Sequence, residues 1–91
     1  MVTLGRIVYT QGIAAEIESG KITEHDLRRL LIRHQNGDWG NLGAEDKAAN
    51  DYAAKHGERI LSSYIVDGIG KVWVITEWDR SVTTILFPSE Y

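Results

Sequence analysis

The sequence predicts a two-layer α+β domain, in which an antiparallel sheet of about four strands is covered on one face by helices. Three observations predict this class. A short N-terminal segment is rich in β-branched and aromatic residues, three segments with helical spacing follow it, and the pattern after Gly57 is that of strands separated by turns. The expected order is therefore β-α-α-α-β-β-β. The chain has 91 residues, enough for one hydrophobic core, so we expect residues 1–91 to form a single domain.

The first two elements are a strand and a short helix. Residues Gly5–Thr10 (GRIVYT) have strand composition. In Gln11–Ser19, Ile13 and Ile17 lie four residues apart and form one apolar stripe. Thr10 is the expected N-cap of this helix.

The second helix has stronger boundary signals. Thr23 is a favoured N-cap residue, and Asp26 places a negative charge in the first turn, where the helix dipole favours it. Asn36-Gly37 ends the helix. One face collects the apolar residues and one imidazole: Leu27, Leu30, Leu31 and His34.

The third helix follows a glycine-rich turn, Gly37–Gly43, and spans Ala44–His56. Acidic residues open it, while Lys55 and His56 close it before Gly57. Small side chains let a helix approach its neighbour closely, so we expect tight packing on the sheet. The expected packing face is Ala48, Ala49, Tyr52 and Ala53.

Three strands complete the chain. Ile60–Val66 alternates in the manner of a strand, and Asp67–Gly70 is the expected hairpin turn. The almost wholly apolar Lys71–Glu77 is the expected central strand. Ser81–Phe87 is the last strand, and Pro88 ends it because proline cannot donate to a β-ladder.

Composition excludes several classes of function. The chain is 43% hydrophobic and 25% charged, which excludes a disordered protein. It has no cysteine, hence no disulfides and no thiolate zinc site. The net charge of −3 argues against a general nucleic-acid binder. Without a long apolar run or a signal peptide, we expect a cytoplasmic protein with no membrane contact.

Two long motifs link the chain to other proteins. They are HQxGDWG at His34–Gly40 and WxITExDRSVTTIL at Trp73–Leu86, followed by the ending PSEY. Through them the chain resembles, from about Leu4 to Tyr91, a family of small bacterial proteins of plasmids, genomic islands and other mobile elements. That family has no established activity. The resemblance implies an accessory role, such as toxin, antitoxin, defence or anti-defence factor or adaptor, and supplies no catalytic residue.

Two histidines at helix ends are the candidate catalytic groups. His34 and His56 each occupy the last turn of a helix, where an imidazole can cap carbonyl groups or serve as a general acid or base. If they converge with Arg80 as the anion contact, they have the residue types of a metal-independent endoribonuclease of toxin type, with RNA as substrate. The structural interpretation is the more common one. The three histidines lack compact ligand spacing, so we expect no metal, and no other cofactor.

The candidate binding residues are Asp38, Trp39, Trp78 and Thr84. Trp39 lies between glycines and is either a plug of the core or a recognition residue. Trp78 lies at a turn and is the tryptophan we expect to be exposed, in contrast to Trp73. Thr83 and Thr84 point to opposite faces of their strand, so one packs while the other is exposed or lines a groove.

The preferred hypothesis is a non-enzymatic protein-binding or adaptor module that forms a homodimer. A domain this small buries only roughly 60% of the surface that its unfolded chain exposes, so pairing through a sheet edge or through the alanine-faced helix would stabilise it. An uncovered edge at Ser81–Phe87 and an exposed Trp78 would support this hypothesis. The endoribonuclease is the alternative. A third possibility is a small-ligand site between the Gly37–Gly43 loop and the sheet.

Overall fold

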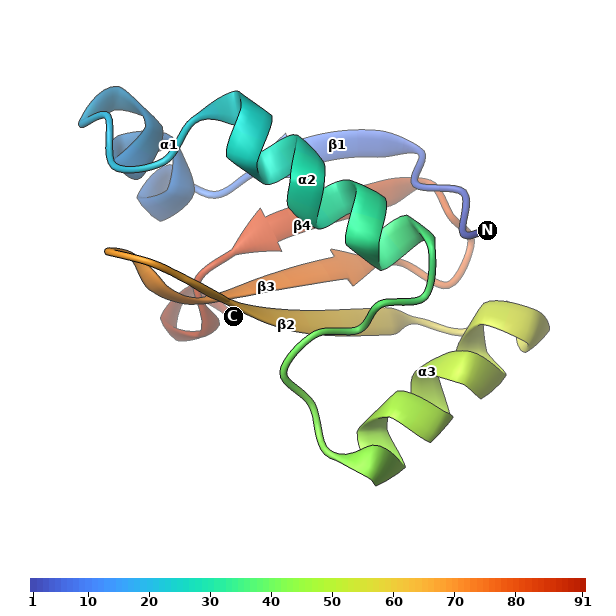
Figure 1. The fold of residues 1–91 in the computed structure, drawn as a ribbon. Coiled ribbons are helices and arrows are strands. Elements are labelled where there is room, and N and C mark those ends of the chain that lie inside the picture. The colour runs from blue at the N-terminus through green and yellow to red at the C-terminus, as the bar shows by residue number, and fades with distance from the viewer.

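The computed structural model describes the whole chain, Met1–Tyr91, and has the expected element order (Figure 1). The α+β class and the order β-α-α-α-β-β-β are thereby confirmed. The elements are β1 (Arg6–Tyr9), α1 (Gln11–Glu18), α2 (Glu24–Gln35), α3 (Ala44–His56), β2 (Ile60–Val66), β3 (Gly70–Thr76), β4 (Val82–Leu86) and a final 3-10 turn, η1 (Pro88–Glu90).

The four strands form one mixed sheet in the order β1-β4-β3-β2. The β2–β3 and β3–β4 pairs are antiparallel, whereas β1 runs parallel to β4, with Ile7 opposite Thr83. The uncovered edge at Ser81–Phe87 that would support the adaptor hypothesis is absent, because β4 lies inside the sheet. The reason is Gly5: its φ of 65° and its lack of a Cβ let the chain pass against the carbonyls of Arg80 and Ser81, which places β1 beside β4.

Helices α1 and α2 cover one face of the sheet (Figure 1). Helix α2 begins with the expected cap, now seen as a full capping box in which Asp26 N–H donates to Thr23 Oγ1 and Thr23 N–H donates to Asp26 Oδ2. The apolar faces of both helices pack against alternate residues of β2, β3 and β4. The resulting core consists of Ile13, Ile22, Leu27, Leu30, Tyr64, Val72, Val74 and Ile85.

The N-terminus of α1 is capped differently from the prediction. Thr10 is the N-cap residue, but its hydroxyl donates to Glu90 Oε1 instead of capping the helix. Glu90 Oε2 accepts from the N–H of Gly12, so η1 supplies the capping carboxylate from the other end of the chain.

Helix α3 lies beside β2, at the edge of the sheet (Figure 1). The predicted packing face of α3 is partly wrong, because Ala48, Ala49 and Tyr52 are exposed. The buried residues of α3 are Asn50 and Ala53. Ala53 joins a second, smaller core with Val2, Trp39 and Ile60. The side-chain amide of Asn50 bonds to the backbone of β2.

Most of the outer edge of β2 is covered by the chain itself. The Asn50 side chain donates to Leu61 O and accepts from Leu61 N–H. Two residues further on, Ser63 N–H donates to Trp39 O, and Ser63 O accepts from Asn41 N–H. An amide side chain and a loop therefore replace a fifth strand along this edge.

Candidate functional site

His34 lies between the last turn of α2 and the sheet and is fully buried. The helical spacing of α2 turns it toward the sheet together with Leu27 and Leu30. Its Nδ1 lies 2.6 Å from Ser62 Oγ on β2, and its Nε2 lies 2.8 Å from Thr76 Oγ1 on β3. The imidazole therefore ties the helix to two strands by polar contacts inside the core.

The hydrogen bonds beyond His34 define its protonation. Thr83 Oγ1 donates to the carbonyl of Leu4 at 2.7 Å, which leaves Thr83 to accept from Thr76 Oγ1, 2.7 Å away. Thr76 has then used its only proton and accepts from His34 Nε2–H. In the neutral imidazole, Nδ1 then carries no proton and accepts from the hydroxyl of Ser62. In this arrangement every hydrogen-bonding group of the network is satisfied with a neutral imidazole.

The electrostatic surroundings also favour the neutral imidazole. Burial, together with the smaller effect of the nearby positive charge of Arg80, lowers the pKa of His34 from 6.5 to about 4. Both ring nitrogens are occupied, and the side chain has no solvent-accessible surface. His34 thus has neither the access nor the free nitrogen that a general acid or base requires.

His56 lies elsewhere, in the exposed last turn of α3, where its ring stacks on Tyr52 with centroids 4.0 Å apart. No pocket of the structure is lined by both histidines. The endoribonuclease hypothesis required His34 and His56 to converge on one cleft, and the geometry does not bring them together. His25, His34 and His56 also form no cluster of metal ligands.

Arg80 has a structural role at the β3–β4 turn. Its Nη1 donates to the carbonyls of Glu58 (2.6 Å) and Glu77 (3.1 Å), and its Nη2 donates to the carbonyl of Ala53 (3.0 Å). It forms no ion pair with Asp79. The guanidinium thereby binds the carbonyl end of α3 to the turn, where a cation is favoured. Three of its five N–H donors are therefore occupied by backbone carbonyls, and the guanidinium is held at the end of α3 instead of standing free as the anion contact that the nuclease hypothesis assigned to it.

The same turn exposes Trp78. Its side chain is 66% exposed, as the sequence predicts, while Trp73 is partly buried. Arg80 adopts a φ of 61°, a left-handed conformation that only a few non-glycine residues adopt. Ser81 fixes the far side of the turn, because its N–H and hydroxyl both donate to Asp79 Oδ1. Trp78 is thus displayed on a rigid loop.

Asp38 and Trp39 hold the loop between α2 and α3 in place. Asp38 accepts two hydrogen bonds from Arg33, the shorter 2.7 Å, and these lower the pKa of its carboxyl group. Trp39 is buried and donates to Asp51 Oδ1 at 2.9 Å. Of the two alternatives, it is therefore a plug of the core and not an exposed recognition residue. Thr84 is partly exposed, on the opposite face of β4 from the buried Thr83, as the alternation predicts.

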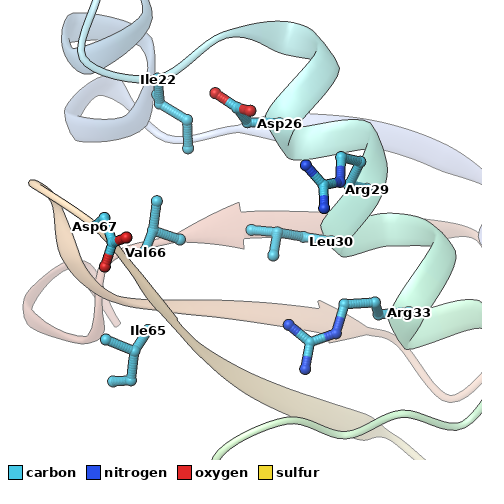
Figure 2. Close-up of a pocket in the computed structure, with 8 residues that line it drawn as sticks. All are labelled: Ile22, Asp26, Arg29, Leu30, Arg33, Ile65, Val66 and Asp67. Carbon is cyan, nitrogen blue, oxygen red and sulfur yellow. The ribbon is translucent and has the colours of Figure 1, made fainter.

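Two grooves are present on the surface beside β2. The first, the α2–β2 groove, has a volume of about 340 Å³ and is shown in Figure 2. Arg29 and Arg33 extend from α2 toward β2, with Leu30 between them and Ile65 on the opposite side. Arg33 is already paired with Asp38 and lies over the ring of Tyr64. No unpartnered buried group lines this groove.

The second, the α3–sheet groove, has a volume of about 460 Å³ and lies between the start of α3 and the face of β2 and β3 that α1 and α2 leave free. It adjoins the Gly37–Gly43 loop, where the third sequence hypothesis expects a small-ligand site. Its walls include Asp46, Ser63, Lys71 and Trp73. The hydroxyl of Ser63 is the one buried side-chain polar atom in the structure that has no hydrogen-bond partner.

Sequence reasoning missed Ser63 and Asp46 as site residues. The available signal was the pair Ser62-Ser63 in the middle of the apolar strand ILSSYIV, because a hydroxyl in a strand interior needs a partner. Alternation alone shows that the two hydroxyls point to opposite faces. Only the structure shows that the hydroxyl of Ser62 bonds to His34, whereas the hydroxyl of Ser63 has no partner.

Comparisons with known proteins add no identification: no family model matches the chain, and no curated protein or solved structure matches it. The longest helix, α3, has 13 residues, and none of the helices has the length and apolar character needed to cross a bilayer.

Proposed function

We propose that this protein is a non-enzymatic protein-binding module, a small adaptor that forms a homodimer through the β3–β4 turn and the adjoining edge of β1. The observation that carries the proposal is Trp78, an exposed indole on a turn whose backbone is fixed from both sides. The resemblance to small accessory proteins of mobile elements fits a role of this kind.

A rigid turn with an exposed tryptophan has favourable binding energetics. Tryptophan is enriched among the residues that dominate protein interfaces, because it buries a large apolar area with few rotatable bonds. The three carbonyl contacts of Arg80 and the two bonds to Asp79 order the backbone before any partner arrives. The entropic cost of ordering this loop is therefore absent from the binding step.

The edge of β1 adjoins this turn and is open. Arg6 N–H and Thr10 N–H donate to β4, so by alternation the N–H and C=O groups of Ile7 and Tyr9 point away from the sheet. The side chains of Ile7 and Tyr9 are 36% and 40% exposed. Two copies of β1 placed antiparallel about a two-fold axis would satisfy these groups reciprocally.

Sedimentation velocity over a range of protein concentrations tests the proposal. We expect a dimer of twice 10.2 kDa for the unchanged chain. Trp78→Ala should weaken the dimer by about 30-fold or more, the effect of losing a dominant interface side chain.

Ile32→Ala is the matched control, because Ile32 is 51% exposed but lies on α2, away from the turn. It should leave the dissociation constant unchanged. A chain that stays monomeric at every concentration contradicts the proposal, as does a dimer that loses no affinity when Trp78 is replaced.

A further inference from the structure

The α3–sheet groove has the properties of a small-ligand site that is independent of self-association. We propose that it binds a free α-amino acid with an apolar side chain, held by its two charged groups. Four observations support this class of ligand: an unpartnered buried hydroxyl, a pair of opposite charges without partners, an aromatic wall, and a volume suited to a small molecule.

Ser63 provides the first observation. Its side chain is 98% buried, since only 2% of its surface is exposed, and its Oγ has no hydrogen-bond partner. It stands on the same face of β2 as Leu61, which also lines the groove, and its cross-strand neighbour is Trp73. A buried hydroxyl without a partner is destabilising, and a polar ligand in the groove would supply the missing hydrogen bond.

The charges of the groove select the type of ligand. Asp46 on α3 and Lys71 on β3 are its only charged residues, and the two sum to zero. Neither forms an ion pair, with the other or with any further residue. A ligand that carries one carboxylate and one ammonium group would match both: the carboxylate at Lys71 and Ser63 on the sheet side, the ammonium at Asp46 on the helix side.

The remaining wall is apolar. Trp73 is partly exposed, and Leu42 and Leu61 stand beside it in the lining. An apolar or aromatic ligand side chain can pack on the indole while the charged end reaches the polar groups. The volume of about 460 Å³ falls within the range of small-molecule sites.

Isothermal titration calorimetry at pH 7 tests the assignment with five probes. These are L-phenylalanine, L-leucine, 3-phenylpropionate, 2-phenylethylamine and D-glucose. We expect saturable binding of the two amino acids. The two singly charged analogues should bind at least tenfold more weakly than L-phenylalanine, because each leaves one charge of the groove unmatched, and D-glucose should not bind.

Three variants locate the contacts. Lys71→Gln should weaken L-phenylalanine binding and leave 2-phenylethylamine unaffected, whereas Asp46→Asn should weaken the amine and leave 3-phenylpropionate unaffected. Ser63→Ala should weaken L-phenylalanine about three- to tenfold while the unliganded protein melts at the same or a higher temperature, since the variant removes an unsatisfied hydroxyl. A residue with only a structural role would move the melting temperature and leave the affinity unchanged.

The proposal is overturned if neither amino acid releases heat or shifts the melting temperature. It is equally overturned if D-glucose or a singly charged analogue binds as tightly as L-phenylalanine, or if Ser63→Ala leaves the affinity intact. Trp78→Ala distinguishes this proposal from the proposed function. It should weaken the dimer and leave amino-acid binding unchanged, so that either proposal can be contradicted without the other.

Discussion

His34 shows how one buried polar residue can be fully satisfied without any catalytic role. Its imidazole accepts from Ser62 and donates to Thr76, and the donor chain ends at the carbonyl of Leu4. A proton added at Nδ1 would turn this nitrogen into a donor and break the hydrogen bond that Ser62 donates to it. The buried imidazolium would also lie in the field of Arg80. His34 is therefore a structural group whose stabilisation depends on pH.

The pH dependence follows from the direction of the pKa shift. The pKa of His34 falls from 6.5 to about 4 on folding, so between these values the unfolded chain binds a proton that the folded chain rejects. The stability that depends on a neutral His34 is therefore fully present above pH 6.5, and it is lost as the pH falls toward 4. The loss should reach about 3 kcal/mol. Urea unfolding at a series of pH values measures it.

Two variants separate this effect from other titrations. His34→Gln should be less stable at pH 7 and should lack the His34 share of the slope between pH 6.5 and 4. His56→Gln should retain the His34 slope, because the substitution leaves His34 and its partners Ser62 and Thr76 unchanged. A slope that is the same in His34→Gln as in the unchanged protein would contradict the assignment of this pH dependence to His34.

For a single residue, the sequence predicts the direction of a side chain better than it predicts the residues that the side chain contacts. Helical periodicity places His34 on the buried face of α2, which is correct. Its two partners lie 28 and 42 residues away in the chain, on separate strands. Side-chain pairing at that separation depends on strand register, and no local pattern determines which hydroxyl of a strand will meet a given helix.

At the scale of elements, the β3–β4 turn depends on a single arginine that has two separable effects. Arg80 makes three hydrogen bonds to carbonyls, which stabilise the turn, and it adopts a left-handed backbone conformation, which is unfavourable for any residue with a Cβ. Substitutions can divide these effects, because alanine removes the side chain alone and glycine relieves the backbone as well.

Arg80→Ala should lower the free energy of unfolding by about 2–4 kcal/mol, through loss of charged hydrogen bonds that leaves part-buried carbonyls unpaired. Arg80→Gly should be about 1 kcal/mol more stable than Arg80→Ala, because glycine adopts positive φ without strain. Thermal and urea unfolding of the two variants measure the difference. Equal stability of the alanine and glycine variants would show that the left-handed backbone contributes no strain.

The elements themselves are largely predictable, whereas their contacts are less so. Helix α2 has its cap, its apolar face and its end encoded within its own residues, and its boundaries agree with the prediction. Helix α3 has an ambiguous surface, because alanine is tolerated both in a core and in solvent. The amide of Asn50 decides the outcome by replacing a strand partner at Leu61, and that need exists only once β2 is an edge strand.

At the scale of the whole molecule, the topology determines where a second copy could add. Consecutive strands commonly pair in order, and in such a sheet β4, the last strand, would be outermost. Instead, β1 covers β4, and the free edges are β1 and β2. The chain protects β2 at Leu61 and Ser63, while β1 has no such cover along Ile7 and Tyr9. The proposed dimer interface therefore moves to β1.

A charge at this edge should separate pairing from folding. Ile7 points its N–H and C=O outward and is 36% exposed, so Ile7→Lys adds a cation to the edge without removing a bond to β4. In a two-fold antiparallel pair the two lysines lie near each other, and we expect at least tenfold weaker dimerisation with nearly unchanged thermal stability of the monomer. Ile65→Lys is the matched control, because Ile65 is 59% exposed on the opposite edge strand. If Ile65→Lys dissociates the dimer and Ile7→Lys does not, the interface lies at β2, and the self-association surface proposed at β1 is wrong.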